Sequence, residues 1–257
     1  MKQPVLFLGH GSPMNALAEN EFTKKLGKLA TKIPTPKLIL VISAHWETKG
    51  TWVTGMDKPK TIHDFFGFPQ ALFNVQYPAP GDSNFAKSLS LNSSDPNIGL
   101  DENNWGLDHG TWSVLRHMYP KANIPVVQLS IDSTKPFEYH YNLGKKLAKL
   151  REEGVLILGS GNIVHNLRTI SWKETATPLD WALEFDNWIK ERAVARDFKS
   201  LVESPLNTKA GKLSIPTPEH YLPLLYTLGA ADEKSELVFD IEEIQNASIS
   251  MRSFRFA

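Results

Sequence analysis

Three histidines follow apolar runs that have the composition of buried β-strands. His10 follows VLFLG, His45 follows LILVISA, and His165 comes shortly after VLILG. In open α/β sheets ligands bind beyond the carboxyl ends of the strands, so these runs would deliver three imidazoles to one crevice. A lone histidine is more often a hydrogen-bonded core or loop residue, but three at equivalent places favour a shared site.

Two further histidines are candidates for the same site. In the segment IPTPEHYLPLLY, Thr217 is expected to cap a helix that Pro218 begins, which puts His220 in the first turn. The positive end of a helix keeps an imidazole neutral and available to a metal. Its neighbour Glu219 must point elsewhere, because adjacent helical residues do not share a face, and either residue could be the ligand. His109, in the glycine-flanked loop WGLDHGTW, is expected to line a pocket.

The other histidines and motifs are weaker candidates. His63, in TIHDFFGFP, lies in an aromatic loop that can simply pack over the sheet. His140 shares an apolar helical stripe and is expected to be structural, and His117 is expected to be a surface or packing residue. GSGNIV resembles a dinucleotide loop, but Val164 stands where the third glycine belongs. Ser12, in HGSP, is better explained as a turn residue than as a nucleophile.

The elements that must position these residues alternate between strand and helix. The expected strands cover residues 4–9, 38–43, 125–131 and 154–159, and the expected helices cover 20–33 and 133–154. This order predicts a single α/β domain, residues 1–257, with a mainly parallel mixed sheet flanked by helices on both faces. Residues 236–242 and 247–256 are expected to add a C-terminal β-hairpin. The longest irregular stretches, 56–82 and 92–112, are expected to shape a site.

Composition excludes several classes of function. The 257 residues include 28 basic and 28 acidic side chains, so no electrostatic footprint for nucleic acid or an anionic membrane is present. The absence of cysteine rules out disulfides and thiolate ligands, which leaves histidine and carboxylate for metal binding. The N-terminal apolar run is too short for a signal peptide or a membrane span. A cytoplasmic protein with a small substrate is expected, and its oligomeric state is not predicted.

Eight motifs in order along the chain carry a resemblance to a known family. They are LGHGSPMNAL, SAHWET, TIHDFFGFPQALF, YPAPG, GLDHGTW, VVQLSID, GSGNIVHNLR and PTPEHYLPLLY, and they extend from near residue 6 to near residue 230. Together they resemble the DOPA 4,5-dioxygenase branch of the class III extradiol ring-cleavage dioxygenases. Each motif alone is weak, but the set is highly specific and covers most of the chain.

The resemblance implies a mononuclear metal centre and insertion of both atoms of O₂ into a catechol, such as DOPA, to give a ring-opened semialdehyde. It implies that His10 and His45 are metal ligands. By the same resemblance, His165 corresponds to a histidine that acts as acid/base residue in the wider family and is also described as a zinc ligand in this branch. His220 stands where the wider family has a glutamate ligand, which makes the site softer toward zinc than a 2-His-1-carboxylate triad. Fe(II) is expected for turnover, and Zn(II) is plausible as the bound ion.

The same resemblance assigns the pocket around the metal. His109 is expected to hydrogen-bond the bound oxygen or the substrate hydroxyl. An aromatic wall for the catechol ring could come from four side chains in three of the motifs, although aromatics beside a sheet edge are more often packing. The predicted substrate-contacting residues are Trp46, His63, Phe65 and Tyr77, with Phe66 as a further aromatic candidate.

Two other functions stay open at this point. Zinc has no redox chemistry, so a zinc-loaded site would favour a hydrolase or lyase that uses metal-bound water with His165 as the proton shuttle. A non-catalytic binding protein with structural zinc is the third hypothesis. It predicts a closed four-ligand site with no exchangeable water.

Overall fold

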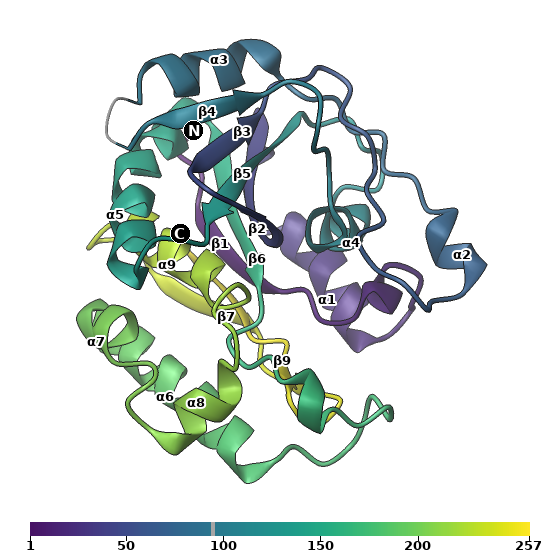
Figure 1. Cartoon of the computed structure of the whole chain (residues 1–257), viewed down its shortest axis with the longest axis vertical. Helices are drawn as coiled ribbons and strands as arrows, with labels where there is room; N and C mark the ends of the chain where they lie inside the picture. Colours follow the sequence, from purple (N-terminus) through teal and green to yellow (C-terminus); the bar gives the residue numbers. More distant parts are fainter. Residues whose placement is uncertain (94–95) are drawn as a thin grey trace.

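An eight-stranded mixed sheet forms the centre of the computed structural model, which describes residues 1–93 and 96–257 (Figure 1). Its strand order is β4-β3-β5-β2-β6-β1-β10-β7. The central strands β5, β2, β6 and β1 are parallel, whereas β3 pairs antiparallel with β5, and β10 with β1 and β7. The strands are β1 (Val5–Gly9), β2 (Leu38–Thr48), β3 (Thr51–Thr54), β4 (Ile98–Asp101), β5 (Val126–Asp132), β6 (Val155–Gly161), β7 (Leu237–Ile241) and β10 (Ser253–Phe256). The predicted fold class is confirmed.

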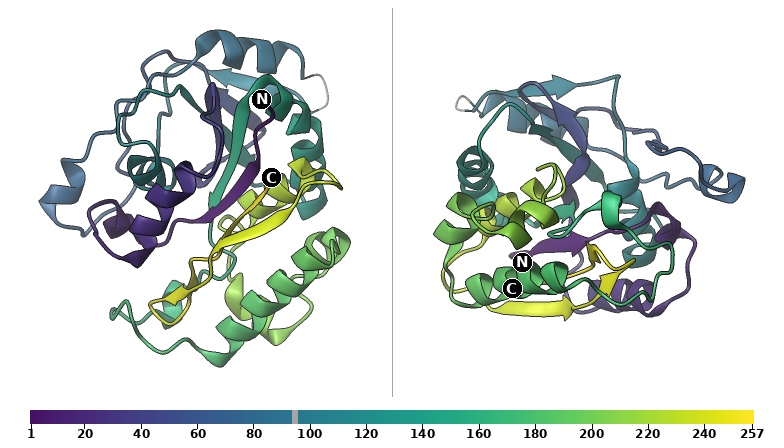
Figure 2. Two further views of the ribbon diagram at one scale, coloured as in Figure 1. Left: turned by 180° about the vertical axis from the view of Figure 1, so that it is seen from behind. Right: turned by 60° about the horizontal axis from the view of Figure 1, so that its bottom comes forward.

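Helices cover both faces of this sheet, as Figures 1 and 2 show from several sides. One face carries α5 (Phe137–Leu147), α9 (Leu222–Ala230), α6 (Asp180–Val194), α7 (Phe198–Glu203), α8 (Lys209–Ser214) and α3 (Ser83–Leu91). The other carries α1 (Glu21–Ala30), α4 (His109–Met118) and α2 (Gln70–Phe73). Each face has its own apolar core. Within β2, Leu40 and Ile42 point into the core under α5 and α9, while Ile39 and Val41 point into the core under α1 and α4. Burial on both sides explains why the central strands are continuously apolar.

The first predicted helix forms as α1, but the second begins later than predicted. Asn20 and Thr23 make a reciprocal capping box that begins α1. Pro136 occupies the N-cap position of α5, and no side-chain hydrogen bond caps the helix. The Thr134 side chain instead hydrogen-bonds the Asp132 carboxylate 2.6 Å away. The end of the predicted helix is the 3₁₀ helix η2 (Ala148–Glu153), which Gly154 terminates with φ of 93°.

The predicted C-terminal hairpin is confirmed and supports the segment that carries His165. β7 and β10 pair antiparallel, and between them β8 (Ile244–Gln245) and β9 (Ile249–Ser250) make a second small ribbon. The Ser250 backbone N–H donates to the Val164 carbonyl at 3.0 Å, and His165 forms an isolated bridge with Ile249. The hairpin tip therefore fixes the backbone on either side of His165.

Two short strands were not predicted. β4 lies inside the stretch 92–112, which was expected to be irregular and of which residues 94 and 95 are outside the described residues. β3 follows β2 after a tight turn at Gly50, where φ is 78°. Both strands have four residues, too few to produce a recognisable period along the sequence.

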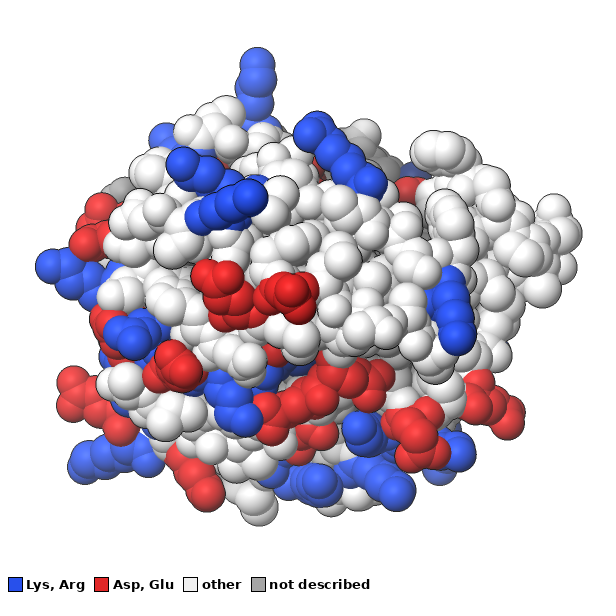
Figure 3. Space-filling view, turned by 90° about the horizontal axis from the view of Figure 1, so that it is seen from below, with Lys and Arg blue, Asp and Glu red and all other residues white. Residues whose placement is uncertain are grey.

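The surface mixes both signs of charge. On the face seen from below, lysine and arginine side chains lie among aspartates and glutamates, and a broad area carries neither (Figure 3). Among the described residues, none of the helices has the length and apolar character needed to cross a bilayer.

His140 is a buried structural histidine, and we expect it to make stability depend on pH. Its Nδ1 lies 3.0 Å from the Tyr226 hydroxyl, and burial lowers its pKa from 6.5 to about 4. In the unfolded chain His140 takes up a proton near pH 6.5, so above that pH its full contribution to the free energy of unfolding is present. It is lost as the pH falls toward 4, by about 3 kcal/mol. Urea unfolding of wild type and His140→Gln between pH 7 and pH 4.5 measures this, and an identical pH dependence of the two chains would contradict the assignment.

Candidate active site

His10 directly follows β1, and its neighbours define which ring nitrogen carries the proton. The side chain is 1% exposed, and its Nδ1 lies 3.0 Å from the Ser160 hydroxyl of β6. That hydroxyl donates its single proton to the Gly110 carbonyl at 2.6 Å. The Ser160 oxygen must therefore accept a hydrogen bond from His10 Nδ1–H. In the neutral ring this leaves the lone pair on Nε2, which faces the other histidines.

His45 lies within β2 rather than beyond its end. Pairing of β2 with β6 ends at Ser43, and the register with β5 shifts between Ile42 and Glu47. The ladder is irregular there and bulges outward, and such irregularities re-aim side chains at the edge of a site. The strand was expected to stop at residue 43, but the chain instead bulges and continues to Thr48. The bulge presents the imidazole beside the end of β1.

His109 is the first residue of α4, where a loop was predicted. The fully buried Asp108 caps this helix by accepting the Thr111 N–H at 3.1 Å. The same carboxylate accepts hydrogen bonds from the Ser43 hydroxyl and the Gln128 amide, both at 2.7 Å. These contacts attach the start of α4 to β2 and β5, so that the His109 ring faces the bulge of β2.

Asp64, which sequence reasoning did not single out, lies between two of the histidines. Its Oδ1 accepts the His109 backbone N–H at 2.9 Å, and its Oδ2 lies 2.8 Å from His109 Nδ1 and 3.3 Å from His45 Nδ1. Burial opposes ionisation of this carboxyl, but the hydrogen bonds from His109 and the electrostatic attraction of the His109 and His45 rings outweigh it and lower its pKa to about 2. An ionised carboxylate only accepts, so His109 Nδ1 donates a hydrogen bond to it, and at ion-pair distance a proton rather than a lone pair on His45 Nδ1 faces it. The only sequence signal was an acid next to His63 in an aromatic loop.

The Nε2 atoms of His10 and His45 lie 3.1 Å apart. Because each ring carries its proton on Nδ1, each Nε2 of the neutral rings carries a lone pair, and two lone pairs at this distance need a cation between them. Nitrogen ligands about 2.0–2.1 Å from one ion lie roughly 3–3.4 Å apart across a four-coordinate site. The donor set and its spacing therefore fit a single metal ion.

His220 and His165 complete the cluster from the opposite side. The His220 ring centroid is 5.1 Å from those of both His10 and His45, and its Nδ1 is buried without a hydrogen-bond partner. The His165 ring stacks on it at 3.5 Å with an interplanar angle of 10°. The predicted helix start was wrong, because α9 begins only at Leu222. His220 lies in the preceding turn, where the Pro218 carbonyl accepts the Tyr221 N–H at 2.9 Å.

The cluster holds its histidines in the neutral form that binds metals. Burial first, and then repulsion among the rings, lowers the pKa of His10 and His220 well below 6.5. Burial similarly lowers the pKa of His45 well below 6.5 and that of His165 to about 4. Potential ligand atoms lie within 4.8 Å of one another in two groups, one of which includes Glu219. The groups are His10, His45 and His109, and His165, Glu219 and His220.

Comparison with known proteins decides the family. The protein-family model described as the catalytic LigB subunit of aromatic ring-opening dioxygenase matches residues 5–252. The chain belongs to this LigB family. It is a metal-dependent extradiol dioxygenase by family and fold, as the motifs predicted.

Named relatives and a solved structure agree with this assignment. The chain is 49% identical over 257 residues to a 4,5-DOPA dioxygenase extradiol of Escherichia coli K12, with coverage of 98% of this chain and 94% of the relative. A Beta vulgaris protein of the same name is 38% identical, with coverage of 97% and 95%. The crystal structure of an uncharacterized protein from Escherichia coli K12 superposes with a TM-score of 0.87 at 44% identity and covers both chains completely.

The aromatic residues predicted to contact substrate in this LigB-family chain have different surroundings. The Phe65 ring meets the His109 ring edge-on at 5.6 Å, so it borders the cluster. Trp46 stacks on Trp105 at 5.7 Å. The Tyr77 hydroxyl is buried and donates to the Tyr119 carbonyl, and His63 Nε2 lies 3.0 Å from the Val75 carbonyl. Phe66 is 92% exposed. The structure thus brings one predicted aromatic ring into contact with the histidines.

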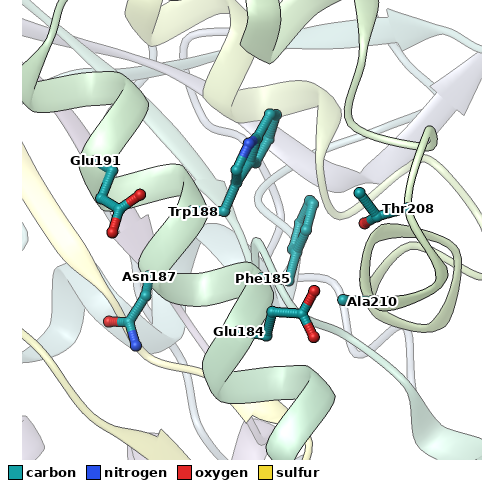
Figure 4. A pocket seen from close by; sticks show the side chains of 7 residues that line it. All are labelled: Glu184, Phe185, Asn187, Trp188, Glu191, Thr208 and Ala210. Carbon is teal, nitrogen blue, oxygen red and sulfur yellow. The ribbon is translucent and has the colours of Figure 1, made fainter.

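A hollow of about 330 Å³ lies away from the LigB site, between α6 and α8 (Figure 4). Its walls combine the stacked rings of Phe185 and Trp188 with the carboxylates of Glu184 and Glu191. None of the residues that line it belongs to the histidine cluster, so we assign it no part in ring cleavage.

Proposed function

We propose that residues 1–257 form one catalytic domain that cleaves a catechol ring, with DOPA or a related catechol as substrate and a ring-opened semialdehyde as product. The names of the relatives support this substrate class. The observation that carries the proposal is the pair of imidazole nitrogens, His10 Nε2 and His45 Nε2, which face each other at 3.1 Å in a chain of the LigB family. The protein would act in the cytoplasm on small molecules, without nucleic acid or membrane partners.

His10, His45 and His220 would hold the metal ion. The unpartnered Nδ1 of His220 supports its place in this set, because a buried ring nitrogen without a hydrogen bond is costly unless an ion satisfies it. Three neutral imidazoles would leave coordination positions for a catechol and O₂. Fe(II) would serve turnover, because a redox-active ion can couple the electrons of the two reactants, whereas zinc cannot.

His165 would act as the acid/base residue rather than as a fourth ligand. Lone pairs of imidazole nitrogens lie in the ring plane. The planes of His165 and His220 are nearly parallel, and their ring centroids are 3.5 Å apart. Two such rings cannot both direct a lone pair at one ion, so His165 is available to take a proton from a catechol hydroxyl and return it later. His109, which Asp64 orients, would hydrogen-bond the substrate hydroxyl or oxygen.

The zinc-dependent hydrolase or lyase is not favoured, because the family that matches nearly the whole chain opens aromatic rings. A closed structural zinc site is likewise not favoured, since the family that matches nearly the whole chain is catalytic.

Anaerobic reconstitution with Fe(II) tests this function directly. We expect the iron-loaded chain to consume O₂ with DOPA or another catechol and to form a coloured semialdehyde, while the zinc-loaded chain consumes none because zinc is redox-inert. An oxygen electrode and visible absorbance measure both outcomes. If bound iron is verified and none of a panel of catechols causes O₂ uptake, the proposed function is wrong.

A further inference from the structure

We propose that Asp64 is the positioning residue of the metal site, and that its single carboxylate orients both a metal ligand, His45, and the neighbouring His109. The proposal rests on the metal site described above. It assigns a role to a residue that neither the motif spacing nor the donor chemistry had indicated.

Three N–H groups converge on this carboxylate. Oδ1 accepts the backbone N–H of His109, and Oδ2 accepts from His109 Nδ1 at 2.8 Å and lies 3.3 Å from His45 Nδ1. The Asp64 side chain is only 13% exposed, so water competes weakly for these contacts. By hydrogen-bonding the His109 Nδ1 proton and attracting that of His45 Nδ1, Asp64 places the unprotonated Nε2 of each ring on the side away from itself. For His45 that side is the one where His10 lies.

The loop that carries Asp64 is held on both sides. The Ile62 backbone N–H donates to the Leu107 carbonyl at 2.7 Å, and the Ile62 carbonyl accepts from the Trp112 indole at 2.8 Å. His63 Nε2 lies 3.0 Å from the Val75 carbonyl. His63, predicted to contact substrate, therefore has a second explanation as an anchor of this loop. A carboxylate on an anchored loop can hold two rings in a constant orientation.

An amide cannot replace this carboxylate. Asparagine has one acceptor oxygen, and its NH₂ group would face either the backbone N–H of His109 or the two ring N–H groups. Either orientation removes at least one of the three contacts and brings donors together. Loss of a carboxylate that orients a ligating histidine commonly weakens metal affinity by about 10–100-fold.

The test compares Zn(II) affinity of the full-length wild type with that of Asp64→Asn and Asp64→Ser, by competition with a chromophoric chelator. Asp57→Asn is the matched control, because Asp57 is an exposed carboxylate whose side chain accepts from Ser83. We expect about 10–100-fold weaker binding for both Asp64 variants and unchanged binding for the control. The visible spectrum of bound Co(II) should also change in the Asp64 variants only.

Thermal unfolding of the metal-free chains separates positioning from a purely structural role. A purely structural role would lower the melting temperature and leave the affinity and the Co(II) spectrum of the folded chain unchanged, and that result would overturn the proposal. If Asp64→Asn does not fold, Asp64→Ser carries the same comparison. A wild-type chain that binds no Zn(II) would instead refute the metal site and the function built on it.

Discussion

Replacing His10 or His45 by alanine is expected to abolish stoichiometric metal binding and, with it, ring cleavage. Each substitution removes one of the two nitrogens that face each other at 3.1 Å. A protein zinc site with four ligands is worth about 10–16 kcal/mol, or roughly 3 kcal/mol for each ligand, so the loss of one weakens binding by about a hundredfold or more. Metal analysis of the purified, iron-reconstituted variants and their O₂ uptake measure both losses.

The matched control for this experiment is His117→Ala. His117 is also a histidine, but its Nε2 lies 2.8 Å from the Asn15 carbonyl and it serves packing between α4 and the 3₁₀ helix η1 (Pro13–Ala16). Its replacement should leave one ion per chain and wild-type turnover. Full activity in His10→Ala or His45→Ala would show that the metal, if any, binds elsewhere.

Replacing His165 by glutamine is expected to separate metal binding from turnover. The variant should retain its ion, because His220 and not His165 supplies the third ligand, and it should lose about 10²–10⁴-fold in kcat as a general acid/base is removed. Glutamine preserves polarity and approximate size but cannot exchange a proton near neutral pH. Metal content, catechol affinity and single-turnover rates of the iron-loaded variant measure the three effects.

His220→Ala is the partner experiment, because the two stacked rings exchange roles if the assignment is reversed. We expect this chain to lose metal as His10→Ala does. Metal loss in His165→Gln together with retention in His220→Ala would make His165 the ligand. Unchanged turnover in His165→Gln would end its assignment as the acid/base residue.

The centre of the fold was predictable because of its burial. Residues 38–42 and 155–158 are apolar at every position since the sheet has a core on each face, and that pattern is strong in a sequence. The short strands β3 and β4 lack it, and they were missed. Helix starts were misplaced at Thr134 and Thr217 for a local reason: each side chain hydrogen-bonds a nearby carboxylate instead of a helix N–H.

The sequence by itself determined the chemistry: histidines after apolar runs, no thiols, and an ordered set of motifs that identifies the family. Only the tertiary structure distinguished the histidines suited to metal binding from the one suited to proton transfer. The bulge that aims His45, the stacking that separates His165 from His220, and the carboxylate of Asp64 between two rings all depend on contacts between distant segments. Residue types and spacing carry no information about ring planes or tautomers, since these depend on which distant donor or acceptor each nitrogen meets.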